Sequence, residues 1–218
     1  MILIISLLYT ATDVSSKVVT SWFELLMKGG IIMIPIFLLS FICIYLFIER
    51  YLYIKRVTAI DNRVLDSTIN ELKQGNLDRA LILVQNNQTA IGKILEGGLS
   101  KVGRPIHEVE SQLETVTNLE ITKMEKDTGF LGIIAGVAPM LGFIGTISGV
   151  IKIFYNISLA DNISIGIISG GLYQKMICSG AGLIVGVIAY AAYHLLQMKI
   201  DRYTINLQEN LINFLRVL

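Results

Sequence analysis

The chain has 218 residues and a formal net charge of +1, and it is 53% hydrophobic but only 16% charged. A soluble domain carries roughly 25% charged residues, so this composition argues against a soluble protein, and the lack of a basic stripe argues against nucleic-acid binding. The two cysteines, Cys43 and Cys178, lie in apolar runs, where we expect them to pack as small residues. The sequence lacks the clustered, regularly spaced ligands of a metal site or a disulfide framework, and we expect no cofactor.

Residues 1–28 are expected to form a periplasmic segment at the membrane surface. The opening MILIISLL resembles the apolar part of a signal peptide, but it lacks a basic start and a good cleavage site, so we expect it to be retained. Residues 15–27 then place Trp22 and four apolar side chains near one helical face. That pattern is typical of an interfacial helix with its tryptophan at headgroup level.

Three apolar runs are long enough to cross a bilayer. Ile31–Ile48 and Gly129–Ile151 contain no charged residue, and Ile163–Leu196 is interrupted only by Lys175. Eighteen helical residues rise about 27 Å, and lipid cannot satisfy open backbone groups, so these runs must be helices. The sequence predicts an all-α membrane protein with spans at 29–49, 129–155 and 164–196.

The distribution of lysine and arginine predicts the orientation. Basic residues flank one end of each span: Arg50, Lys55 and Arg56 after the first, Lys123 and Lys126 before the second, Lys199 and Arg202 after the third. The opposite ends carry fewer. The positive-inside rule then places residues 50–128 and the C-terminal helix 197–218 in the cytoplasm, and the N-terminus and the 156–163 turn in the periplasm.

The cytoplasmic block has the signals of several helices. Helices are expected at 62–74, 77–85 and 90–102, with breaks at Gly75 and Gly103, and Pro105 suits the first position of the next helix. Apolar residues then recur at helical spacing, mostly away from the acidic residues Glu108, Glu110, Glu114 and Glu120. No breaker precedes the second span, so one helix is expected from Pro105 to about Tyr155, with a possible kink at Pro139. A second long helix is expected from Ile163 to the C-terminus.

Small and polar residues share one face in each of the last two spans. The second span holds Gly142, Gly145, Thr146 and Gly149 on this face, and the third holds Lys175, Ser179, Gly182, Gly186 and Ala189. Glycines at this spacing predict close helix packing. A hydroxyl can bond back to its own helix and a lysine near the periplasmic boundary can snorkel to water, so neither requires a functional role.

No acidic residue lies in the second or third span. A proton relay inside a membrane usually needs a carboxylate. The chain can therefore supply polar walls for such a relay, but the titrating group must come from another chain. Gln174 is a neutral amide in an apolar stretch, so it should have a partner or water.

Two segments resemble signatures of the ExbB/TolQ/MotA proton-channel family. Residues 138–149, APMLGFIGTISG, resemble APLLGLLGTVxG, and residues 171–183, GLYQKMICSGAGL, are similar to GIxEALxxTAxGL. The stretches KGGIIMIPIFL at 28–38 and IER at 48–50 are similar to the first-span pattern of ExbB proteins from Bacteroidetes-type bacteria. The resemblance extends from about Trp22 to the C-terminus.

The resemblance implies a homopentamer in the inner membrane of a Gram-negative bacterium, with its second and third spans around a central pore. Two copies of a single-span ExbD- or TolR-type partner occupy the family's pore, and the partner's membrane Asp carries the proton. ExbB-type members energise TonB, which opens outer-membrane receptors for iron complexes and cobalamin. The resemblance implies that the pore-lining residues here are Thr146, Ser179, Gln174 and Lys175.

Three of these positions depart from the family pattern. Ser179 stands where the family has threonine and keeps the hydroxyl, whereas Gln174 replaces the family glutamate and Lys175 replaces a small residue. The amide keeps the hydrogen bonding of a glutamate without its charge, and a lysine beside it can raise the electrostatic barrier to protons entering from the periplasm.

Two other classes of function are alternatives to a motor. An intramembrane hydrolase would use Ser148 or Ser179 with His194, but Ser179 and His194 are 15 residues, or about 22 Å, apart on one helix, and Ser148 lies toward the other membrane face. We therefore expect no enzyme activity. A structural membrane scaffold explains the glycines but not the paired polar faces. Among motors, TolQ-type envelope constriction and gliding or flagellar stators remain alternatives.

Overall fold

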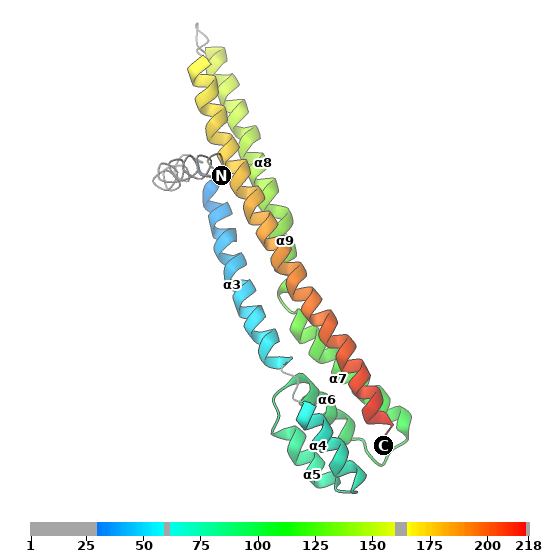
Figure 1. Cartoon of the computed structure of the whole chain (residues 1–218). Coiled ribbons are helices and arrows are strands. Elements are labelled where there is room, and N and C mark those ends of the chain that lie inside the picture. The colour runs from blue at the N-terminus through cyan, green and yellow to red at the C-terminus, as the bar shows by residue number, and fades with distance from the viewer. Residues whose placement is uncertain (1–29, 59–61, 160–164, 217–218) are drawn as a thin grey trace, which may run out of the picture. The chain divides into compact units, whose positions relative to one another are not determined.

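The computed structural model describes residues 30–58, 62–159 and 165–216 (Figure 1). The expected segment 1–28 and residues 160–163 of the expected periplasmic turn lie outside these ranges. The described residues form seven α-helices and no strand, as predicted for an all-α protein. They belong to two compact units, one formed by residues up to 44 together with 132–190, and the other by 45–131 together with the residues from 191 onward.

Three long helices carry the apolar runs. These are α3 (Met33–Val57), α8 (Thr128–Leu159) and α9 (Ile165–Leu215). Each contains a stretch long and apolar enough to cross a membrane, which confirms the prediction of three such helices. Pro35 lies in the first turn of α3, where a missing N–H costs no helical bond, and α8 continues as a helix past Pro139.

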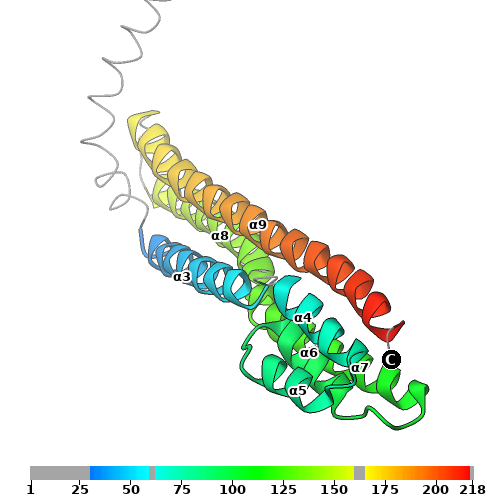
Figure 2. The same cartoon turned by 60° about the horizontal axis from the view of Figure 1, so that its bottom comes forward.

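Four shorter helices lie between α3 and α8. They are α4 (Asn62–Lys73), α5 (Leu77–Gln85), α6 (Ala90–Leu99) and α7 (Ile106–Glu125), drawn from cyan to green in Figure 2. Gly75 and Gly103 have φ of +76° and +92°, a conformation that favours glycine, and both interrupt the helices where predicted. Three bounds differ from the prediction: α4 ends at Lys73, α6 ends at Leu99, and Pro105 precedes α7 instead of starting it.

The prediction of one helix from Pro105 to about Tyr155 is wrong. A two-residue turn separates α7 from α8: Lys126 has an extended ψ of 135°, and Asp127 has φ of 63°. Asp127 is the one described residue other than glycine with positive φ. Aspartate tolerates this left-handed conformation better than most residues, which explains how a helix breaks here without glycine or proline. At its other end α8 runs to Leu159, four residues further than expected.

The second unit has an apolar core. Two glycines let α6 pack against α7, because a Cβ on Gly98 would stand 2.5 Å from Leu113 and one on Gly97 would stand 2.8 Å from Val116. The C-terminal part of α9 buries a stripe at helical spacing, formed by Leu196, Ile200, Tyr203, Leu207 and Phe214. Apolar residues at this spacing are typical of the buried face of a helix.

Glu120 is the buried member of the four acidic residues of α7 that were expected to lie mostly away from the apolar positions. It is only 2% exposed. Lys123, one turn along α7, lies 2.6 Å from its carboxylate, and Lys93 of α6 lies 3.8 Å away. Two nearby cations explain how a carboxylate is tolerated inside the packed unit.

The first unit contains the predicted pore-lining residues and the glycines of the second and third spans. In it, α8 and α9 lie side by side, as both views show (Figures 1 and 2), and the N-terminal part of α3 packs on them. The buried residues Met33, Ile36 and Cys178 form a cluster there, against apolar residues of α8 and α9. Both cysteines are buried and free, in agreement with a packing role.

Candidate functional site

Glycines bring α8 and α9 into backbone contact. A Cβ added to Gly142 would stand 3.0 Å from Ser179 Cα and 3.1 Å from the Cys178 carbonyl oxygen. One added to Gly182 would stand 2.5 Å from the Ala138 carbonyl oxygen. Any side chain at either position must therefore push one helix backbone away from the other.

The contact continues at Pro139. A proline has no N–H, so the Ala135 carbonyl, four residues earlier, receives no helical hydrogen bond from it. A Cβ on Gly186 would stand 2.5 Å from the Pro139 ring and 3.0 Å from the Ala135 oxygen. The turn of α8 that Pro139 interrupts thus faces Gly186 of α9. With no side chain there, the Cα–H of Gly186 can approach the Ala135 carbonyl oxygen.

Gly145 extends the same face of α8. A Cβ there would stand 2.8 Å from Cys178 Sγ, which is fully buried. The five glycines singled out in the sequence thus all lie against residues of the facing helix. Two other glycines of α9, Gly170 and Gly180, have open space where a Cβ would be.

Two hydroxyls lie beside this contact. Thr146 is half-buried, and its Oγ1 donates a 2.6 Å hydrogen bond to the Phe143 carbonyl oxygen of its own helix. Its oxygen keeps lone pairs that can accept a hydrogen bond from another molecule. Ser179 is also half-buried, and its backbone lies against Gly142. Both groups can bind a protonated acid, but neither can carry a proton by titration.

Lys175 lies along the glycine face. Its Cγ, Cδ and Cε occupy the space that a side chain on Gly149 would need, and its Nζ lies 3.8 Å from where a Cβ on Gly30 would stand. No carboxylate of the described residues forms an ion pair with it. The side chain of Gln174, next to it, falls outside the described part of the structure.

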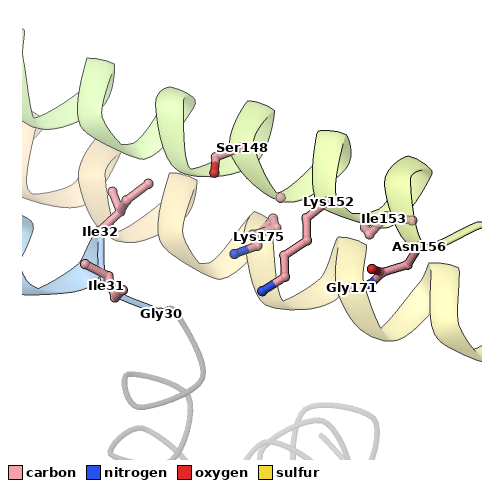
Figure 3. Close-up of a pocket in the computed structure, with 10 residues that line it drawn as sticks. Gly30, Ile31, Ile32, Ser148, Lys152, Ile153, Asn156, Gly171 and Lys175 are labelled. Atoms are coloured by element: carbon pink, nitrogen blue, oxygen red, sulfur yellow. The ribbon is translucent and has the colours of Figure 1, made fainter. Parts of the chain in front are cut away.

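Lys175 lines a cavity of about 530 Å³ between α8, α9 and residues 30–32, which lead into α3 (Figure 3). The other polar residues of its wall are Ser148, Lys152 and Asn156. These three were not predicted as site residues, although their spacing of four residues places them on one face of α8 and was readable in the sequence.

The outer faces of α8 and α9 are apolar and uncovered in the single chain. Phe143, Ile151, Phe154, Leu183 and Val187 are each more than half exposed. Such faces are suited to lipid or to neighbouring copies of a membrane protein. Within the described ranges, no group of three or more His, Cys, Asp or Glu residues is placed to hold a metal ion.

The sequence is similar to a known protein family and to several of its members. Residues 86–209 match the MotA/TolQ/ExbB proton channel family. The chain is 30% identical to an ExbB homolog for biopolymer transport from Methanothermobacter thermautotrophicus, over 82% of this chain and 63% of that protein. It is 25% identical to an ExbB-like protein of Synechocystis, over 78% of this chain and 68% of the relative. It is also 29% identical to the Tol-Pal system protein TolQ of Haemophilus influenzae, over 38% of this chain and 37% of TolQ.

The family match covers more than half of the chain, and it includes the glycine contact, both hydroxyls and Lys175. Together with the three long apolar helices, it identifies a multi-pass membrane protein. This chain belongs to the MotA/TolQ/ExbB proton channel family.

Proposed function

We propose that this chain is the channel-building subunit of a proton-driven motor in a bacterial inner membrane. The observation that carries the proposal is the pair α8/α9: two closely packed apolar helices of a proton-channel family, with hydroxyls beside the contact and no acidic residue in the apolar spans 129–155 and 164–196. The N-terminus would be periplasmic and the C-terminus cytoplasmic, as the basic residues predict.

The proton would be carried by a carboxylate of a second protein. An ExbD- or TolR-type partner with one membrane span has the required chemistry, because an Asp can be charged or neutral, whereas Thr146 and Ser179 only donate and accept hydrogen bonds. A hydrogen bond to a charged group contributes about 1.5–3 kcal/mol. Thr146 is therefore proposed to stabilise the partner's Asp in one of its two protonation states.

The uncovered faces of α8 and α9 favour an assembly of several copies. Exposed aromatic and branched side chains flank the half-buried Thr146 and Ser179. A hydroxyl facing lipid loses hydrogen bonds that it keeps when it faces a partner or water. We propose a homopentamer with two partner copies in its pore, and native mass spectrometry after mild extraction should show it, whereas a dominant stable monomer would contradict it.

The output of the motor is proposed to be TonB-dependent transport across the outer membrane. The similarity to ExbB proteins favours this output, and the similarity to TolQ favours envelope constriction as the alternative. Gliding or flagellar stators, and a structural scaffold without proton flow, are the further alternatives. The protein encoded by the neighbouring gene, and co-purification of a single-span Asp-bearing protein, distinguish a motor from a scaffold.

Nutrient uptake in a deletion strain tests the site. Thr146→Val keeps the shape of the side chain but removes the hydroxyl, so it should abolish partner-dependent uptake while the complex forms in normal yield. Ser179→Thr and Gln174→Glu restore the family's residues and should be tolerated. Wild-type uptake by well-expressed Thr146→Val would contradict the role of this hydroxyl.

A further inference from the structure

We propose that the cavity beside Lys175 binds the phosphate of an anionic phospholipid, held by Lys152 of α8 and Lys175 of α9. The inference goes beyond the motor function and does not depend on it, since it needs only that these apolar helices span a membrane.

The charge of the cavity is unbalanced. Both lysines line it, and none of the wall residues in the described part of the chain is Asp or Glu. Neither lysine forms an ion pair with a described carboxylate. Like charges that share a partly apolar space disfavour each other, and an anion between them removes this repulsion. The ligand that the site lacks is therefore negatively charged.

The position of Lys175 shows that the cavity is built around it. Its stem lies flat over Gly149, and no other residue type leaves that space free. A second glycine, Gly171, lets α9 approach Ile153 of α8, because a Cβ there would stand 2.6 Å from Ile153 Cδ1. Gly149 therefore gives the lysine stem room to lie along α8, and Gly171 gives α9 room to approach it.

The walls suit a phosphodiester better than a small soluble anion. Ser148 and Asn156 add hydrogen-bond donors around the lysines (Figure 3). Ile31 and Ile32 complete the wall on the side of α3, and beyond them Ile34, Leu38 and Phe41 are more than 60% exposed along that helix. This apolar strip offers a place for the acyl chains of a lipid whose headgroup occupies the cavity. Basic pockets between membrane helices bind anionic headgroups in this way.

The test uses the purified, delipidated full chain in detergent, titrated with phosphatidylglycerol and followed by native mass spectrometry. Loss of one charge-assisted contact should weaken binding about ten-fold or more. Lys175→Gln and Lys152→Gln should each show this loss, and Lys175→Arg should bind within about two-fold of the wild type, because an arginine also pairs with phosphate. Lys55→Gln is the matched control: it removes the same charge from the exposed far end of α3 and should bind like the wild type.

Two further arms distinguish the source of the phosphate. Phosphatidylcholine has the same phosphodiester without net charge and should bind at least ten-fold more weakly, and inorganic phosphate should not raise the unfolding temperature. Equal binding of phosphatidylglycerol by the wild type and both Gln variants overturns the proposal. Stabilisation by inorganic phosphate equal to that by phosphatidylglycerol also overturns it. Co-purification of the Gln variants with the partner protein gives a further outcome. If the variants no longer bind the partner but bind phosphatidylglycerol like the wild type, the cavity binds a protein carboxylate and the proposal is wrong.

Discussion

Arg50 Nη2 donates a 2.9 Å hydrogen bond to Asp127 Oδ2, and so ties α3 to the turn between α7 and α8. The two residues are 77 positions apart in the sequence. The Arg50 side chain is 10% exposed and that of Asp127 is 30% exposed, so water screens this pair less than a surface pair. The contact holds the left-handed Asp127 in place, and with it the N-terminal end of the apolar helix α8, which begins at Thr128.

The first prediction concerns this pair. Asp127→Asn keeps a residue that tolerates positive φ but removes the charge, and Arg50→Gln removes the other charge. Each should destabilise the protein by about 1–3 kcal/mol, because a charge-assisted hydrogen bond is lost and its partner stays largely buried. Thermal unfolding in detergent measures the effect.

The matched control is Arg104→Gln. Arg104 pairs with Glu108 at 3.3 Å, but their side chains are 58% and 40% exposed, so the loss should stay below about 0.5 kcal/mol. Arg50 also pairs with Glu49 at 2.7 Å, so Asp127→Asn is the variant that isolates the contact with Asp127. Similar losses in the control and in Asp127→Asn would mean that this contact does not stabilise the turn.

The second prediction concerns the contact between α8 and α9. Gly182→Ala puts a methyl group against the Ala138 carbonyl and should lower the unfolding temperature by several degrees, equivalent to about 1–3 kcal/mol. Gly180→Ala, two residues earlier, has open space for the same methyl and should be neutral or slightly stabilising, because alanine favours helix. The same unfolding temperature for both variants would disprove the packing role of Gly182.

The third prediction concerns pH. Tyr203 lies beyond the apolar run of α9, and its burial raises the pKa of its hydroxyl to about 12. The nearby Ile91 backbone lowers this pKa by a smaller amount. Among the described residues, no partner forms a hydrogen bond of good geometry with the hydroxyl. The unfolded state loses this proton near pH 10, before the folded state does, so the stability from the neutral phenol is present below pH 10 and falls between pH 10 and 12.

Tyr203→Phe should therefore flatten the fall in unfolding temperature between pH 10 and 12. At pH 7 it should be neutral or slightly stabilising, since the hydroxyl is buried without a good partner. An unchanged profile in Tyr203→Phe would show that another group causes the alkaline loss.

The fourth prediction concerns topology. With the native cysteines replaced, a cysteine at Gln74, in the turn after α4, should be shielded from a membrane-impermeant thiol reagent in intact cells, and one at Ser158, near the end of α8, should react. Both positions are exposed, and Gln74 avoids the positive φ of Gly75. Reaction at Gln74 without lysis would reverse the orientation predicted from the basic residues.

The sequence predicts the helices well where a local signal marks them. Uncharged runs mark the three long helices, and Gly75 and Gly103 mark two breaks because only glycine takes their φ values readily. The break at Asp127 has no such signal. Its conformation is held by Arg50, and no pattern of neighbouring residues shows a contact from so far along the chain.

The site is predictable only in part for the same reason. Helical spacing groups the glycines, but only the packed helices show that Gly149 makes room for Lys175 and that Lys152 lines the same cavity. Burial of Glu120 also depends on another helix, since Lys93 comes from α6. The periodicity of the sequence shows which residues share one face of a helix, but it does not show which helix faces pack against each other.

The central claim is that this chain forms a proton channel whose titrating group belongs to a partner. Proton influx into liposomes that contain the purified complex, measured with an internal pH-sensitive dye under an applied membrane potential, tests it most directly. The account predicts influx with the wild-type complex, little or none with the Thr146→Val complex, and none with this chain alone. Equal influx with this chain alone and with the complex would contradict the account.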